Sequence, residues 1–270
     1  MEKVEIRALQ SDLQSFSLIR YPELLTRLIE SGNFICPTRT EFREKSYFLR
    51  HDVDFSIRNA IKMARIENKL GIHAHYYFLA DSQSYNVTSM HFRNAVDEIK
   101  SLGHCLGLHF DRQNESISVE EEFLTQIKRL SVAAKIEIRA YSPHNPGPLV
   151  MKYTRDIPQE YINAYSYVNE GKMGYISDSN GKWQSDYLDE FLQKTRKNDY
   201  QILIHPEWWT EQEMEPLSKI IFALGEEFLG NLTDYLESTI SAPRYSVQQR
   251  INMRNQIDSI ASSIKVILGK

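Results

Sequence analysis

Short apolar runs that end in polar residues recur along the chain and predict buried strands. The first, "YFLRHDVD" at 47–54, passes directly from three apolar residues into charged ones. Runs of this length, rich in β-branched and aromatic residues, are typical of strands buried on both faces. Five further runs lie at 73–82, 104–113, 136–145, 174–183 and 200–209.

Helical patterns separate these runs. In 56–70 the apolar residues follow helical spacing, Ser56 could cap the start of the helix, and Gly71 could end it. The same type of pattern is found at 88–102, 118–134 and 185–197.

The alternation of strands and helices predicts parallel βαβ units, because parallel strands need long crossover connections. We expect an α/β fold, a distorted or incomplete (β/α) barrel with parallel strands, whose site lies at the carboxyl ends of the strands. An open doubly wound sheet follows the same rule and is the alternative. In either fold, the charged groups of "RHDVD" are expected at the rim of the core rather than deep inside it.

The barrel motifs occupy 47–209. Residues 1–46 are expected to form a helical N-terminal segment, with a helix at 15–32 that stops at Gly32. Residues 210–270 are expected to form C-terminal helices. The absence of repeats and of Gly/Ser linkers favours a single domain over 1–270.

Two helices are predicted in the C-terminal part, at 216–239 and 246–268. The first could be broken near Gly225 or Gly230. The second carries an amphipathic stripe that should pack on the body of the protein or on a partner subunit, so an oligomer formed through this helix is one prediction. The stripe consists of Ile251, Ile257, Ile260 and Ile264.

Composition narrows the functional classes. The chain has 270 residues, of which 25% are charged, with a net charge of −4, so no basic field indicates nucleic-acid binding. Its two cysteines form no CxxC motif, which argues against a thiolate zinc site or a disulfide framework. The N-terminus lacks the apolar region of a signal peptide, and no apolar run reaches the length of a membrane span. These features predict a cytoplasmic protein with no transmembrane segment.

The pair of carboxylates at the end of the first run is the first candidate site. In an extended segment Asp52 and Asp54 point to the same side. When two carboxylates are held close together, the pKa of one of them rises unless a cation lies between them. One could bind a metal while the other takes a proton from bound water. Alternatively, Asp54 could cap the helix that starts near Ser56.

Three histidines are candidates for the same site. His109 ends the run "GLHFD", and imidazole suits zinc and other first-row metals, although a core histidine bonded to backbone is an alternative. His144 sits in "SPHNPG", where prolines and a glycine fix a turn. His205 ends the strand of "LIHPEWW" and could be a general acid with a pKa near neutral.

Several other residues could bind substrate. Asp178, in "SDSNGKW", could orient a catalytic group, and Trp183 could form the wall of a pocket. Glu207 and Trp208 follow His205 after Pro206, and exposed tryptophans are costly unless they bind something. Sugars offer apolar faces that stack on indole rings, so these residues favour a carbohydrate substrate.

The order of these motifs resembles the polysaccharide deacetylase superfamily, the NodB-homology deacetylases of carbohydrate esterase family 4. The resemblance covers roughly 47–209 and is carried by "RHDVD", "LGIHAHYYFL", "LGHCLGLHFD" and "LIHPEWW". The "HDVD" and "HPEWW" signatures resemble a branch found in bacterial O-antigen and capsule biosynthesis. The resemblance implies a distorted (β/α) barrel and one divalent metal, with zinc as the expected ion. It also implies that Asp52 is the catalytic base, that Asp54 and His109 are metal ligands, and that His205 is the general acid.

The chain departs from the family pattern at two positions. Val53 splits the usual pair of adjacent aspartates, and Gln113 stands where the family has its second histidine. The third metal ligand is therefore His144 or Asp111, and we favour His144 for its imidazole and rigid loop.

The resemblance predicts a metal-dependent hydrolase that removes an N-acetyl group from a sugar or sugar precursor in surface polysaccharide biosynthesis. The absent signal peptide favours a nucleotide- or lipid-linked precursor. An inactive sugar-binding or scaffold protein on the same fold is the alternative that Gln113 favours. A glycosidase that uses Asp52 and Glu207 is a third hypothesis.

Overall fold

The computed structural model describes residues 16–35, 46–183, 199–240 and 245–267. The helix predicted at 185–197 lies outside these residues. The strands are β1 (Asn33–Ile35), β2 (Ser46–Val53), β3 (His75–Leu79), β4 (Cys105–Phe110), β5 (Ala140–Pro143), β6 (Ile162–Asn163), β7 (Met173–Ser177) and β8 (Asp199–Ile204). The helices are α2 (Tyr21–Ser31), α3 (Ile57–Lys69), α4 (Met90–Ser101), α5 (Val119–Ala134), α6 (Pro148–Tyr153), α7 (Ser166–Asn169), α9 (Pro216–Ile240) and α10 (Val247–Ile267), with short 3₁₀ turns between some of them.

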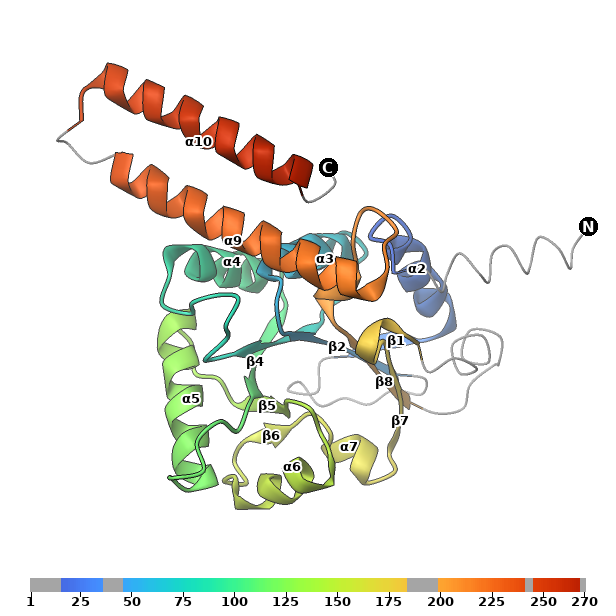
Figure 1. The fold of residues 1–270 in the computed structure, drawn as a ribbon. Helices are drawn as coiled ribbons and strands as arrows, with labels where there is room; N and C mark the ends of the chain where they lie inside the picture. Colours follow the sequence, from blue (N-terminus) through green and yellow to red (C-terminus); the bar gives the residue numbers. More distant parts are fainter. Residues whose placement is uncertain (1–15, 36–45, 184–198, 241–244, 268–270) are drawn as a thin grey trace, which may run out of the picture.

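The strands form one curled parallel sheet. Their order is β6-β5-β4-β3-β2-β8-β7, and β1 pairs with the start of β2. Helices surround the curled sheet on its outer side (Figure 1). Within the described residues β6 and β7 are the two ends of the sheet and do not pair with each other, so the barrel is open. The prediction of a distorted, incomplete (β/α) barrel is confirmed.

All six predicted runs contain a strand. The sequence pattern missed β1 and β6, which have three and two residues and are too short to show any periodicity. Because the strands are parallel, the polar residues that follow each of them gather at one end of the barrel.

The helices after the first strands start and stop at the predicted signals. Ser56 caps α3, its Oγ accepting a hydrogen bond from Asn59 N at 3.2 Å. Gly71 follows α3 with φ +73°, a conformation that glycine adopts without strain. The N-terminal helix was predicted to start at residue 15, but α2 begins at Tyr21, because Pro22 belongs in the first turn of a helix.

Strand β2 carries charged residues in its buried interior. Arg50 and His51 are 0% exposed and Asp52 is 2% exposed, so the expectation that these groups lie at the rim is wrong. Successive side chains of a strand point to opposite faces, and here both faces supply partners. Arg50 and Asp52 pair with each other inside the barrel, whereas His51 Nε2 lies 2.7 Å from Glu67 Oε1 on the helical side. Pairing makes the burial of these charges tolerable.

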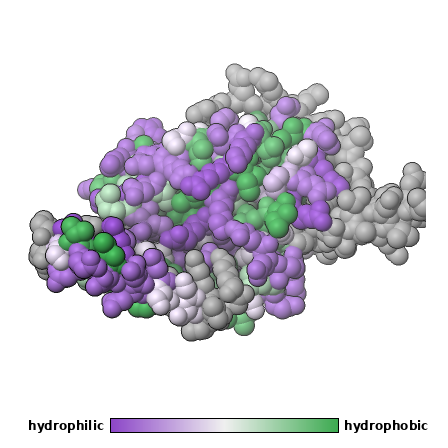
Figure 2. Space-filling view, turned by 90° about the horizontal axis from the view of Figure 1, so that it is seen from above, coloured by the Kyte–Doolittle hydropathy of each residue, from purple (hydrophilic) through white to green (hydrophobic). Residues whose placement is uncertain are grey.

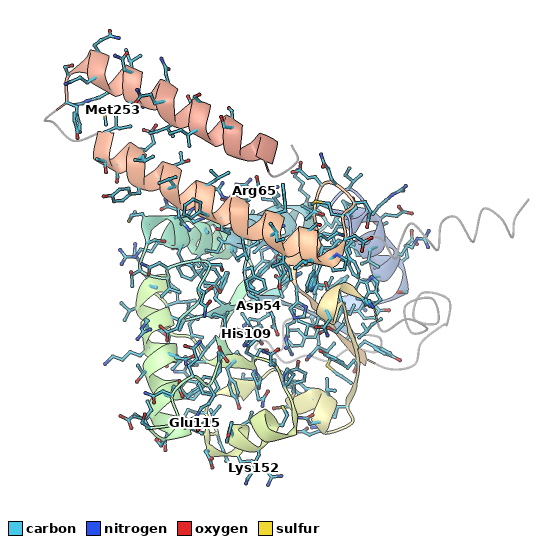
Figure 3. The ribbon with its side chains drawn as sticks, viewed as in Figure 1. Asp54, Arg65, His109, Glu115, Lys152 and Met253 are labelled. Atoms are coloured by element: carbon cyan, nitrogen blue, oxygen red, sulfur yellow. The ribbon has the colours of Figure 1, made fainter. Side chains whose placement is uncertain are left out.

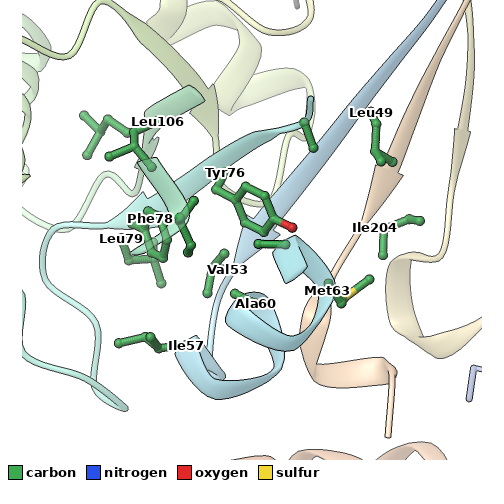
Figure 4. Close-up of a cluster of buried hydrophobic side chains, with 14 of the residues drawn as sticks. Leu49, Val53, Ile57, Ala60, Met63, Tyr76, Phe78, Leu79, Leu106 and Ile204 are labelled. Carbon is green, nitrogen blue, oxygen red and sulfur yellow. The ribbon is translucent and has the colours of Figure 1, made fainter. Parts of the chain in front are cut away.

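The core between the sheet and α3 surrounds a buried carboxylate. Glu67 accepts hydrogen bonds from Tyr21 and Tyr76, at 2.5 and 2.7 Å, in addition to its contact with His51. Burial alone would raise the pKa of Glu67, but His51, and after it His104 and Tyr21, hold the pKa below its ordinary value. The apolar side chains near Glu67 pack against one another across β2, β3 and α3 (Figure 4). Glu67 therefore joins α2, β2 and β3 to α3.

Inside the barrel, a layer of apolar side chains lies below the polar layer that contains Arg50 and Asp52. The apolar layer consists of Phe48, Tyr77, Ala140, Ala164 and Met173. Gly107 is required beside it, because a Cβ at this position would collide with the ring of Tyr77. This layer closes the bottom of the barrel and leaves the polar groups facing its open end.

Helix α9 runs without a break through both of its glycines, so the predicted interruption near Gly225 or Gly230 is wrong. Gly230 instead permits close packing, since a Cβ there would collide with the guanidinium of Arg58. Nearby, the buried Glu227 carboxylate accepts hydrogen bonds from Arg58 N at 2.6 Å and Ser56 Oγ at 3.4 Å. A carboxylate at a helix N-terminus is favourable. Helix α9 is thus anchored at the start of α3.

Helix α10 folds back antiparallel to α9 and extends beyond the barrel (Figure 1). Arg254 on α10 pairs with Glu237 on α9 at 3.0 Å. Of the predicted stripe, Ile257 is 8% exposed, but Ile251 and Ile260 are 46% and 52% exposed. The stripe therefore does not form one buried face on the body, because α10 packs against α9 instead.

No described helix combines the length and the apolar content needed to cross a membrane. The assignment of 1–270 to a single domain stays a prediction.

Candidate active site

The carboxyl ends of five strands bring the predicted residues to the open end of the barrel. Asp54 follows β2, and His109 is near the end of β4. His144 follows β5, Asp178 follows β7, and His205 follows β8. Residues that lie up to 151 positions apart in the chain are therefore neighbours in space, as the contacts below show.

Asp54, His109 and His144 form a group that could hold a metal ion. One ligand atom from each lies within 4.8 Å of the others. His109 Nε2 is 3.2 Å from Asp54 Oδ1, and the two imidazole rings are 4.9 Å apart at their centroids. Figure 3 shows Asp54 and His109 next to each other at the centre of the molecule. No other such group of three occurs among the described residues.

The orientation of His109 suits a cation. Its Nδ1 lies 3.0 Å from the carbonyl oxygen of Ser142, which fixes the proton on Nδ1 and directs the lone pair of Nε2 toward Asp54. Asp54 Oδ1 is buried and makes no hydrogen bond within the described structure. The lone pair of His109 Nε2 and the unpaired oxygen of Asp54 repel each other, and a cation bound between them would remove this repulsion. One carboxylate with two imidazoles is also a usual donor set for catalytic zinc.

Asp111, which is not a member of the candidate ligand group, orients His144. The Nδ1 of His144 lies 3.2 Å from Asp111 Oδ1, and Gln113 Nε2 donates to Asp111 Oδ2 at 2.9 Å. Burial would lower the pKa of His144, but the Asp111 contact and the charge of Asp54 raise it above its ordinary value. Of the two candidates for third ligand, His144 is in the group and Asp111 orients it.

Asp52 is clamped by an arginine from its own strand. Arg50 donates from Nε to Oδ1 at 2.9 Å and from Nη2 to Oδ2 at 2.6 Å, and Ser142 Oγ donates to Oδ2 at 3.0 Å. Burial would raise the pKa of Asp52, but Arg50 and then His109 hold it well below its usual range. Asp52 is therefore an oriented anion, with Oδ2 3.7 Å from His109 Nδ1.

The sequence analysis assigned no role to the groups that surround Arg50. Tyr165 stacks on the guanidinium, whose Cζ lies 4.3 Å from the ring centroid. Ser142 accepts from Nη2 at 2.7 Å. With its amide oriented to satisfy both neighbours, Gln201 accepts from Nη1 at 2.8 Å. Arg50 itself could have been found, because it lies two residues before Asp52 and therefore on the same face of the strand.

His205 forms a buried pair with Asp178. Its Nδ1 lies 2.7 Å from Asp178 Oδ1, and its backbone N–H also donates to this carboxylate. Trp209 Nε1 donates to Asp178 Oδ2 at 2.9 Å. Burial lowers the pKa of His205, but Asp178 outweighs it and raises the pKa to about 10, in place of the near-neutral value expected from the sequence. His205 is therefore protonated at neutral pH.

Glu207 is buried beside these charges. It is 1% exposed, and its Oε2 has no hydrogen-bond partner in the described part of the chain. Burial and the negative charge of Asp54 raise the pKa of Glu207 well above its ordinary value. Its predicted role in substrate binding stays a prediction.

The expectation of exposed tryptophans is wrong. Trp183, Trp208 and Trp209 are 7%, 8% and 1% exposed. Phe16 lies 5.6 Å from Trp183 and 5.5 Å from Trp209, and Tyr21 lies 4.9 Å from Trp209, between ring centroids. The N-terminal segment thus covers Trp183 and Trp209, which the motif alone could not reveal. Contacts of Trp183 and Trp208 with substrate stay predictions.

Comparisons with known proteins give distant similarities only. No protein-family model matches the chain, and no curated protein matches it in sequence. A CE4 family pseudoenzyme from Bacillus anthracis is 15% identical with a TM-score of 0.41, over 68% of this chain and 62% of that one. The Xyl-CE4 domain of a multidomain xylanase from the hindgut metagenome of Trinervitermes trinervoides is 14% identical with a TM-score of 0.42, over 72% and 85% of the two chains. The Streptococcus pyogenes deacetylase PplD in complex with acetate is 14% identical with a TM-score of 0.42, over 70% and 81%.

The chain spans less than two thirds of the length of the first of these structures. Identities and TM-scores this low transfer no activity, so the chemistry has to be argued from the site itself.

Proposed function

We propose that the protein is a metal-dependent hydrolase that removes an N-acetyl group from a sugar or sugar precursor. The observation that carries the proposal is the group of Asp54, His109 and His144, with an anionic Asp52 and a protonated His205 around it. The motif resemblance supplies the substrate class, the membership of the polysaccharide deacetylase superfamily, and the role in surface polysaccharide biosynthesis.

The three residues of the group would hold one divalent ion, for which zinc is our proposal. Three protein ligands with an open position are typical of catalytic rather than structural zinc. When bound, such an ion supplies a Lewis acid for the amide carbonyl and lowers the pKa of bound water.

Asp52 would accept the proton of the attacking water. Its clamp by Arg50 fixes the direction of its free lone pairs and keeps it ionised, as a base must be. The same clamp makes Asp52 a weak base. It is effective only toward a water that has already been made acidic, which agrees with the position of Asp52 next to the candidate metal ligands.

His205 would donate a proton to the departing amine. Because Asp178 holds its pKa at about 10, His205 carries this proton throughout the neutral range. The Nδ1 contact with Asp178 leaves Nε2 as the donor. In hydrolases with a Ser-His-Asp triad, a carboxylate likewise orients the catalytic histidine and stabilises its protonated form.

Acetate release tests the proposed reaction. Zinc-loaded protein should release acetate, without new reducing ends, from N-acetylglucosamine oligomers or UDP-N-acetylglucosamine. The Asp52→Asn variant keeps the shape of the carboxylate and should lose about 10²–10⁴-fold in rate while retaining its metal. Release of reducing sugar without acetate would instead identify a glycosidase. Stoichiometric metal with no turnover of any N-acetylated sugar would favour a binding protein.

Replacing Asp178 by Asn is expected to shift the pH dependence of turnover. Without the carboxylate, the pKa of His205 should fall from about 10 toward its ordinary value of 6.5. Because the protonated form is the active acid, the decline of kcat at high pH should move to lower pH by the same amount.

The ion pair of His205 and Asp178 also stabilises the folded protein. Since the folded pKa is the higher one, this contribution is complete below about 6.5 and is lost as the pH rises through about 10.

The measurement is kcat as a function of pH, together with an NMR titration of His205. Asp258→Asn removes an exposed carboxylate on α10 and serves as the control. An unchanged alkaline limb in Asp178→Asn would remove His205 from the role of general acid.

A further inference from the structure

Helix α9 exposes a row of hydrophobic side chains that nothing in the described chain covers. The row is Leu217 (69% exposed), Ile221 (53%), Leu224 (36%), Phe228 (63%) and Tyr235 (67%). Their spacing alternates between four and three residues up to Phe228 and places Tyr235 one heptad further on, which is the spacing of a helix seam that packs against another helix. We call this row the free face of α9.

The free face is distinct from the surfaces that α9 already uses. Ala223, Glu227 and Gly230 pack on the body of the protein and lie on a different side of the helix, given 100° per residue. Glu237, which pairs with Arg254 of α10, lies roughly opposite the free face. The free face is therefore left over after the intramolecular contacts have been made.

Helix α10 buries little of its apolar surface within its own chain. On α10, Val247, Ile251 and Ile260 are 74%, 46% and 52% exposed, and Ile257 is the one buried hydrophobic side chain among those described. A helix gains most of its stability in a protein from packing of its apolar face. Seen from above, hydrophobic side chains also gather at the end of the molecule where α9 gives way to α10 (Figure 2). A partner is needed to bury these side chains.

The apolar surface continues from the free face onto the barrel. A groove of about 780 Å³ lies between α9 and residues 82–91, and Leu224, Phe228 and Tyr235 form one of its walls. Met90, 65% exposed, lies on the opposite wall. An occupant of the free face can therefore extend a side chain into the groove.

The two helices of the hairpin carry opposite charges. Helix α9 contains four acidic residues and one basic residue, of which Glu227 is buried against α3 and Glu237 pairs with Arg254 of its own chain, whereas α10 contains three basic residues and one acidic residue. Two hairpins related by a two-fold axis can each place an acidic α9 beside the basic α10 of the other. A two-fold contact uses the same patch on both partners, which a self-complementary hairpin provides.

The size of the hairpin also agrees with a dimer. Helices of 25 and 21 residues are about 37 and 31 Å long, and a strip about 10 Å wide along both offers roughly 700 Å². A stable interface uses about 800 Å² per partner. We propose that the free face of α9 is covered by a second copy of this chain, and that the two hairpins pack as a four-helix bundle.

Sedimentation equilibrium on the full chain tests this proposal. The wild type should have twice its monomer mass of 31.6 kDa at moderate concentration. Phe228→Glu and Ile221→Glu should each raise the dissociation constant at least about 30-fold, as expected for a central interface residue. Both side chains are exposed in the monomer, so the variants should fold normally, which circular dichroism checks.

Val132→Glu is the matched control, since Val132 is 71% exposed on α5 and lies outside the hairpin. It should leave the dimer intact. A wild type that stays monomeric at all concentrations would overturn the proposal, and so would a dimer that both α9 variants leave unchanged. A monomer that sediments with anionic lipid vesicles through the free face would show that lipid is the occupant and would equally overturn it.

Discussion

Replacing Asp54 by Asn is expected to abolish stoichiometric zinc binding. Asp54 is the only carboxylate in the candidate ligand group of the described residues, and its Oδ1 is buried with no hydrogen-bond partner there. An amide oxygen carries no charge, so the cation would be left with two neutral imidazoles. Loss of a residue that merely supports a ligand costs about 10–100-fold in metal affinity, and loss of a ligand should cost more. The rate of deacetylation should fall at least in proportion.

Asp111→Asn provides the graded comparison for this prediction. Asp111 lies next to His144 at 3.2 Å but outside the ligand group. Its replacement should weaken zinc binding by about 10–100-fold without abolishing it. Metal content after gel filtration and calorimetric titration measure both variants independently of activity. Wild-type zinc affinity in Asp54→Asn would show that the ion is held elsewhere, or not at all.

Replacing Arg50 by Met should cause the largest loss of stability. Arg50 is 0% exposed, and its guanidinium forms a two-point hydrogen-bonded pair with the equally buried Asp52. Removal of one partner of a buried ion pair leaves an uncompensated charge and costs about 3–5 kcal/mol. Ser142 and Gln201 would also lose the donors that they accept from. Urea denaturation followed by fluorescence measures the change in the free energy of unfolding.

The double variant Arg50→Met/Asp52→Leu separates the charge from the packing. With both charges removed, much of the lost stability should return, because an apolar pair avoids the cost of burying ions. A single variant within about 1 kcal/mol of the wild type would show that Asp52 finds another partner. A double variant that is as unstable as the sum of its single variants would show that packing, not charge, governs the effect.

The sequence predicted the barrel, and the end at which the candidate residues meet, for one physical reason. In a parallel (β/α) arrangement, the residues that follow each strand must meet at the same end. Identifying the runs that end in Asp54, His109 and His205 was therefore enough to bring these side chains together, without knowledge of any loop. His144, favoured for its imidazole and rigid loop, follows β5 and lies at the same end.

Features that depend on distant packing could not be predicted in this way. The motif "HPEWW" contains no sign that Phe16 and Tyr21 cover its second tryptophan, Trp209, because these partners are 193 and 188 residues away in the chain. The amphipathic pattern of α10 shows which side chains could be buried but not whether the body lies beside them. The burial of Arg50 was missed because its partner on the same strand was assigned to catalysis alone.

The contact of Glu227 with the start of α3 connects the free face of α9 with the candidate ion site at Asp54. Glu227 accepts hydrogen bonds from Ser56 and Arg58, two and four residues after Asp54, and the next residue, Phe228, lies about 100° further round α9 and is exposed. A displacement of α9 would therefore act on the backbone at the start of α3, two residues after Asp54. If association of two copies shifts this helix, occupancy of the ion site and self-association must be thermodynamically linked, and each must change the other by the same factor.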